Sequence, residues 1–260
     1  MRIFKLSIGL ILAVSLCSSL SSCKAENKGN ANDMQPDSVA VKKDSDSQYI
    51  IQYENDPFYK FLSSLPRKKR MAEIMNYKGE DAGMSYYKYC VIDFPLLSPV
   101  EQCADVCMHL RAEYFFRQKQ YGKIHFHDVG GKDHKYTGGA SRQALNAYLK
   151  KIYNISNTAS MYTEMQIVPS LSDIRPGDVL IYPAKGNKLG HVVMVSEVAK
   201  DAKGDIYFQV IQGFTPACEL HIVKNNDVSG NSPWFKLDPN ADVVKIDNFT
   251  FRKDQLRRWK

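Results

Sequence analysis

The sequence predicts an α+β domain in which helices pack on an antiparallel sheet. The stretch 173–217 indicates three strands in succession, separated by turn residues. Capped, amphipathic segments come before this stretch, where helix signals are mixed with further strand signals. No internal repeat is found, and 260 residues with 44% hydrophobic content can bury a sizeable core.

The first 22 residues are predicted to be a lipoprotein signal peptide. Arg2 and Lys5 supply the positive charge, and the apolar stretch 6–16 is too short to span a bilayer as a stable helix. The run Leu20-Ser21-Ser22-Cys23 resembles the lipobox of bacterial lipoproteins, which implies that Cys23 is the lipidation site and inserts its acyl chains into a lipid bilayer. A plain secretory signal with an incidental cysteine is the alternative. We expect an exported protein, lipid-anchored in the cell envelope.

The organisation of the rest of the chain follows from its composition. Residues 23–48 are predicted to form a lipidated, disordered linker, because Lys, Asn, Asp, Ser and Gly dominate and large apolar residues are almost absent. Residues 49–260 are predicted to form a single α+β domain, and no later segment reaches transmembrane length.

The expected elements of this domain are marked by their end signals. Asp56-Pro57 is a cap with proline in first helical position, and Ser98-Pro99-Val100-Glu101 reads as a capping box. The predicted helices cover 57–65, 99–120, 141–153 and 158–165. The predicted strands cover 86–94, 123–129, 179–182, 191–195, 206–211, 218–223 and 243–246.

Two cysteines share the apolar stripe of the second predicted helix. Cys103 and Cys107 are one turn apart, and both fit the core, where free cysteine is often buried. The functional interpretation is that the positive end of the helix dipole acidifies the thiol of Cys103. His191, which follows Gly190 at the start of a strand, would complete a Cys–His pair of the kind found in thiol hydrolases. Cys107 is expected to be structural.

Two motifs in the strand-rich part of the chain support the hypothesis of a Cys–His pair. The motifs PGDVLIY and GHVVMV resemble the second half of NlpC-type and CHAP-type cell-wall hydrolases, which are papain-like cysteine enzymes. The resemblance implies a nucleophile at Cys103, a base at His191 and a third polar residue at Gln212. That third residue would hold the imidazole or polarise the oxyanion. The implied activity is that of a thiol amidase or endopeptidase acting on cell-wall peptide. The usual Asp-Cys-Ser-Gly pattern is replaced by Gln102-Cys103-Ala104-Asp105.

A longer resemblance covers most of residues 50–260. The phrases QCADVCMHLRAEYFF, KIHFHDVGG, IQGFTPACELHIVKN and SPWF resemble an uncharacterised family of bacterial lipoproteins, DUF4846. This resemblance implies no activity. The alternative to an enzyme is therefore a non-catalytic binding or assembly module of the envelope that retains the fold. Peptidoglycan or an envelope protein is the expected partner.

Other classes of partner and cofactor are not favoured. The formal charge of +7 is scattered, and the run Arg67–Arg70 is read as a solvated face, so no nucleic-acid partner is predicted. His125, His127, Asp128 and His134 could supply metal ligands, but a structural role is favoured and no metal or cofactor is predicted.

Export would permit disulfides among the four cysteines that follow Cys23. Three pairings are open, but the irregular spacing is not that of a disulfide scaffold. A bridge between Cys103 and Cys107 within one helix would be strained.

Overall fold

The computed structural model describes residues 48–260. The predicted signal peptide 1–22, the lipidation site Cys23 and the predicted linker up to residue 47 lie outside the described residues. The described part is a mixed α+β fold with a large antiparallel sheet, as the sequence predicts. Between residues 48 and 260, no helix combines the length and the apolar character needed to cross a membrane.

Four α-helices form within the described residues, and each has an identifiable start. The carboxylate of Asp56 accepts hydrogen bonds from the backbone N–H groups of Phe58 and Tyr59, and Ser141 caps the third helix in the same way through Ala144. The helices are α1 (Pro57–Ser63), α2 (Cys103–Arg117), α3 (Arg142–Ile155) and α4 (Thr158–Glu164).

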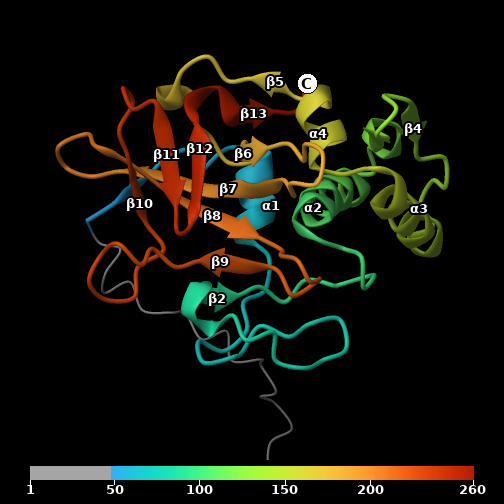
Figure 1. The fold of residues 1–260 in the computed structure, drawn as a ribbon, viewed down its shortest axis with the longest axis horizontal. Coiled ribbons are helices and arrows are strands. Elements are labelled where there is room, and N and C mark those ends of the chain that lie inside the picture. Colours follow the sequence, from blue (N-terminus) through green and yellow to red (C-terminus); the bar gives the residue numbers. More distant parts are fainter. Residues whose placement is uncertain (1–47) are drawn as a thin grey trace, which may run out of the picture. The chain divides into compact units, whose positions relative to one another are not determined.

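Most strands belong to one nine-stranded antiparallel sheet, in the order β2-β9-β8-β7-β6-β13-β5, with β1 paired to β7 and β10 paired to β8. Figure 1 shows these strands one after another, from β5 and β13 at the top of the view to β9 and β2 below. The strands of this sheet are β1 (Ile50–Ile51), β2 (Lys88–Val91), β5 (Gln166–Ile167), β6 (Val179–Tyr182), β7 (His191–Lys200), β8 (Ile206–Gln212), β9 (His221–Val223), β10 (Phe235–Leu237) and β13 (Leu256–Arg258). Two separate hairpins are formed by β3 (His125–His127) with β4 (Asp133–Lys135), and by β11 (Val243–Ile246) with β12 (Phe249–Arg252).

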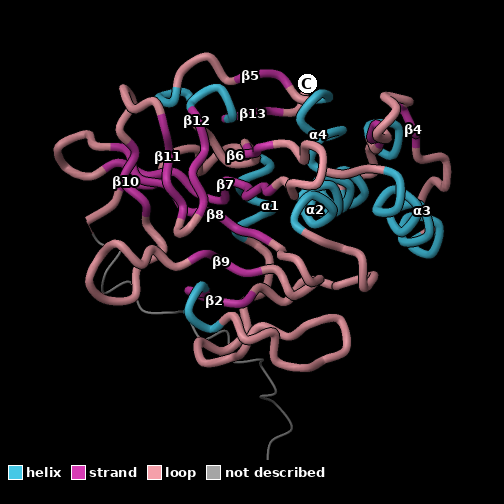
Figure 2. Tube along the Cα trace, viewed as in Figure 1, coloured by secondary structure: helices cyan, strands magenta, loops and turns pink. Residues whose placement is uncertain are grey.

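The two faces of the sheet pack against different elements. Val192 and Met194 of β7 belong to the apolar core shared with the helices, while Val193 and Val195 belong to a second core shared with the β11–β12 hairpin. This division follows from strand geometry, because successive side chains point to opposite faces. In Figure 2 the helices α2, α3 and α4 gather at the right of the view, beside the strands. The long buried strand β7 therefore lies between two hydrophobic layers.

The start of α2 differs from the prediction. The helix begins at Cys103 and not at residue 99, and its capping box is formed by Gln102 and Asp105. Glu101 is turned inward, where its carboxylate accepts from the backbone N–H of Leu97 at 2.6 Å and contacts Nδ1 of His109 at 2.7 Å. With its carboxylate used in this way, Glu101 does not serve as the third residue of the predicted cap. Cys103 is consequently the first residue of the helix.

Several strand boundaries also differ from those predicted from the sequence. The predicted strand 86–94 is shortened to β2, because Ser85–Tyr87 forms a 3-10 turn and Asp93 donates its N–H to Pro66 outside the ladder. The predicted strand 218–223 is reduced to β9. The strands that were not predicted have two to four residues each: β1, β4, β5, β10, β12 and β13. Runs this short carry little periodicity, and their partners are distant in sequence.

Candidate functional site

Cys103 is buried at the N-terminus of α2, with 6% of its surface exposed. Burial raises the pKa of its thiol to about 11, and the nearby carboxyl of Asp105 acts in the same direction. Backbone N–H groups of Val192, Ala104 and Cys103 itself are directed at the sulfur and oppose this rise. The helix terminus therefore stabilises the thiolate as expected, but desolvation outweighs it, and the resting thiol is neutral.

The pKa of the Asp105 carboxyl is itself raised. Its Oδ2 accepts from the backbone N–H of Gln102 at 2.9 Å, while its Oδ1 is buried with no partner among the described residues. Burial raises the pKa of Asp105 to about 8. Near neutral pH the carboxyl is mostly protonated, so a second negative charge beside Cys103 is avoided.

His191 and Gln212 lie together, as the resemblance implies. His191 is the first residue of β7, and its Nε2 lies 3.0 Å from Oε1 of Gln212 at the end of β8. The imidazole stacks on the ring of Phe249 with centroids 3.9 Å apart, and Phe214 meets it edge-on at 5.5 Å. Burial lowers the pKa of His191 to about 4. The imidazole is therefore neutral at physiological pH.

A second buried histidine fixes the protons of this pair. Nδ1 of His221 lies 2.9 Å from the carbonyl oxygen of Glu219, which can only accept, so Nδ1 carries the proton. Burial lowers the pKa of His221 to about 4, so its Nε2 is unprotonated and accepts from the amide Nε2 of Gln212 at 3.2 Å. The oxygen of Gln212 then faces His191, whose Nε2 must donate to it. Nδ1 of His191 then carries a lone pair and has no hydrogen-bond partner among residues 48–260.

Cys103 and His191 are neighbours but are not hydrogen-bonded in the part of the chain that the structure describes. The sulfur lies against the backbone N–H of Val192, which directly follows His191. The thiol comes from the helix side of the sheet, whereas the imidazole packs on Phe249 of the β11–β12 hairpin. The two groups thus approach the beginning of β7 from different sides. Of these two groups, Gln212 contacts the imidazole and not the thiol.

A pocket of about 360 Å³ opens beside Cys103. Its lining includes Gln102, Cys103, Asn157, Thr158 and Gly190. At Gly190 an added Cβ would lie 2.6 Å from the carbonyl oxygen of Tyr182 and even closer to Thr158, so only glycine fits before His191. The close backbone packing required by this glycine forms one wall of the pocket.

Sequence reasoning missed two residues of this region. His221 joins the site only through the antiparallel register that pairs it with Gln212, and the sequence alone does not reveal that register. Gln102 precedes the cysteine, and its Oε1 accepts from the hydroxyl of Thr215 at 3.1 Å. Its Nε2 has no hydrogen-bond partner within residues 48–260, and Gln102 is one of the residues that line the pocket. Its position directly before Cys103, together with a polar amide, was the available signal.

The remaining cysteines fit structural roles. Within residues 48–260, Cys90, Cys103, Cys107 and Cys218 are all free and buried. Cys107 is 1% exposed, and burial raises the pKa of its thiol well above the ordinary value. Its placement agrees with the structural role predicted for it.

Comparison with known protein families shows which family the chain belongs to. The profile of a family described as a domain of unknown function (DUF4846) matches residues 38–140 and 137–258. The chain belongs to this family. No curated protein matches the chain. No solved structure matches it either. The family description assigns no activity to the DUF4846 chain. The residues around Cys103 are therefore the basis for inferring its chemistry.

Proposed function

We propose that this DUF4846 chain is a lipoprotein of the bacterial cell envelope, tethered to the membrane through acylated Cys23, whose papain-like domain is a thiol amidase or endopeptidase acting on cell-wall peptide. The observation that carries the proposal is the His191–Gln212 hydrogen bond of 3.0 Å, which leaves Nδ1 of the imidazole without a partner among residues 48–260. The sulfur of the helix-terminal Cys103 lies against the backbone of Val192, the next residue along β7. The pocket that borders Cys103 gives a peptide a place to bind.

The chemistry assigned to these residues is general-base catalysis without a preformed ion pair. The pKa of the thiol is raised and that of the imidazole is lowered, so both groups are neutral at rest. When the sulfur attacks the amide carbonyl, its proton passes to Nδ1 of His191, and the resulting imidazolium protonates the departing amine. Water then hydrolyses the thioester. The proposal requires a rearrangement at the start of β7 that brings the sulfur, on the helix side of the sheet, to hydrogen-bonding distance of the imidazole, which packs on Phe249.

The oxyanion needs donors that Gln212 does not provide. Both ends of the Gln212 amide are engaged, one with His191 and the other with His221. Gln102 is better placed, because its Nε2 is unpaired among the described residues and its side chain lines the pocket beside Cys103. We assign it the role of donor to the carbonyl oxygen in the transition state.

A second candidate is a non-catalytic binding or assembly module of the envelope. Two features favour it: Cys103 is buried, which raises the pKa of its thiol to about 11, and no hydrogen bond joins Cys103 to His191 within residues 48–260. In this case the pocket would bind a wall peptide or an envelope protein without turnover.

The direct test is product release from purified peptidoglycan and soluble wall peptides, followed by mass spectrometry. For a hydrolase, new amine and carboxyl ends appear and are lost in Cys103→Ala and in His191→Ala. Cys107→Ala is the matched control, one turn along the same helix, and should retain cleavage. Absence of cleavage by the wild type, with retained binding to sacculi, would establish the binding module.

Thiol labelling measures the resting state of the site. At pH 8 a thiol of pKa about 11 holds roughly two-hundredfold less thiolate than a free thiol of pKa about 8.5, so alkylation of Cys103 should be slow. Fast labelling of Cys103 well below pH 8.5, slowed by His191→Ala, would instead show a preformed ion pair. A second experiment tests the predicted lipid anchor: the Cys23→Ser variant should not incorporate a labelled fatty acid.

A further inference from the structure

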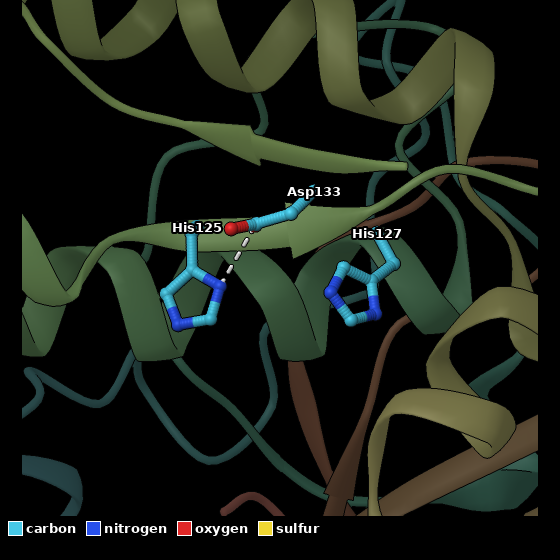
Figure 3. A group of neighbouring side chains, drawn as sticks. All are labelled: His125, His127 and Asp133. Carbon is cyan, nitrogen blue, oxygen red and sulfur yellow. Dashed lines mark hydrogen bonds and ion pairs between the residues drawn. The ribbon is translucent and has the colours of Figure 1, made fainter. Parts of the chain in front are cut away.

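The β3–β4 hairpin carries two histidines on one face. His125 and His127 are alternate residues of β3, so their side chains point the same way, while Phe126 between them is fully buried. Figure 3 shows the two imidazoles side by side below the strand, with Asp133 reaching over from β4. Both histidines are only partly buried and can be reached from solvent.

The strand register adds a carboxylate to this pair. Asp133 lies opposite His127, and its Oδ1 is 2.9 Å from Nδ1 of His125. One ligand atom from each of the three residues lies within 4.8 Å of the others. Ligands held at about 2.1 Å in a tetrahedral site are about 3.4 Å apart, so modest side-chain rotations would close the site. The hairpin thus provides the spacing that a cation requires.

One more acidic side chain lies next to this position. Oε2 of Glu164, at the end of α4, accepts from the backbone N–H of His127 at 3.1 Å. A cation held by the histidines would therefore lie near a second acidic side chain besides Asp133.

Two other residues weighed from the sequence do not belong to this cluster. His134 pairs with Phe126 in the hairpin register, so its side chain leaves on the opposite face, where Nε2 lies 2.8 Å from Oδ2 of Asp128. Asp128 also accepts from the N–H groups of Gly130 and Lys132, which closes the hairpin loop. Asp133 therefore takes the place of Asp128 in the candidate ligand set.

We propose that His125, His127 and Asp133 bind a divalent cation of the zinc class, with one coordination position left open to water or to a ligand. Two imidazole nitrogens and one carboxylate oxygen are ligands that zinc prefers, and three protein ligands with an open position are typical of reactive zinc sites. The site uses none of the residues assigned to thiol chemistry, so it stands or falls independently of the proposed hydrolase.

The test is titration of the purified, metal-free full-length protein with Zn²⁺ by calorimetry, and with Co²⁺ by visible absorption. One equivalent should bind. His127→Ala and Asp133→Asn should each weaken binding by at least about tenfold. Lys135→Ala is the matched control, because Lys135 faces His125 across the hairpin and is not a ligand, so binding should persist.

Thermal unfolding separates loss of the site from loss of the fold. Zn²⁺ should raise the melting temperature of the wild type and of Lys135→Ala, but not that of His127→Ala, whose melting temperature without metal should remain close to the wild type. The proposal is overturned if no stoichiometric binding occurs, or if Zn²⁺ binds the His125/His127/Asp133 triple variant as tightly as the wild type. In the latter case the buried thiols or surface groups would be the ligands.

Discussion

Replacing His221 with glutamine is expected to make the stability of the domain less sensitive to acid. Burial lowers the pKa of His221 to about 4, whereas an unfolded histidine titrates near 6.5. As pH falls below about 6.5, the unfolded chain takes up a proton that the folded protein refuses. The stabilising contribution of the neutral imidazole is therefore complete above pH 6.5 and is lost as the pH falls towards 4.

The size of the effect follows from this shift. One pKa unit corresponds to about 1.4 kcal/mol, so the full shift of His221 is worth about 3 kcal/mol, of which about 2 kcal/mol is lost between pH 7 and pH 5. Glutamine does not titrate, and its side-chain oxygen can still accept from the amide of Gln212. His221→Gln should thus lose about 2 kcal/mol less than the wild type over this interval.

Urea unfolding at pH 7, 6 and 5 measures the difference, with the buried Trp234 and Trp259 as fluorescence reporters. Comparing the two proteins at each pH cancels the contributions of other groups, including Asp105, whose raised pKa acts in the opposite direction. Equal losses in both proteins would refute the assignment of His221 as a dry, neutral histidine. The proton arrangement derived for Gln212 and His191 would then lose its basis.

Substitutions at three further positions test individual contacts. Asp105→Asn removes a carboxyl that raises the pKa of Cys103, so alkylation of Cys103 between pH 8 and 10 should become faster, and an unchanged pH–rate profile would contradict this. Asp56→Ala removes the cap of α1 and should lower the free energy of unfolding by about 1 kcal/mol in urea, whereas Asp56→Asn should cost less. Arg258→Met leaves the fully buried carboxyl of Asp178 without its ion-pair partner and should cost about 3–5 kcal/mol; a loss below about 1 kcal/mol would show that Asp178 is protonated or hydrated.

The elements with strong local signals could be predicted from the sequence. Val179–Tyr182 and Val243–Ile246 match β6 and β11 residue for residue, because apolar, β-branched runs end at clear turns. The start of α2 could not be predicted, because the inward turn of Glu101 depends on His109, eight residues later. The buried contact between Glu101 and His109 removes Glu101 from the predicted cap, and the helix instead starts after Gln102.

In the candidate site, too, local motifs could be predicted from the sequence, but contacts between distant residues could not. Gly190-His191 could be recognised locally, and the steric need for glycine explains why the motif is informative. The contact of Gln212 with His221, and that of Asp133 with His125, depend on cross-strand registers. The burial that raises the pKa of Cys103 likewise comes from the packing of α2 on the sheet, and the position of a cysteine at a helix start does not determine that packing.

The pairing of β1 sets where a force applied from the N-terminal side enters the domain. Ile50 pairs with Lys200, the last residue of β7, whereas His191 is the first. Ten residues of strand span about 30 Å, so a pull or a surface attachment acting through the N-terminal side enters the domain far from the pocket that contains Gly190. Within residues 48–260, the point where the chain enters the domain and the pocket beside Cys103 therefore lie at opposite ends of β7.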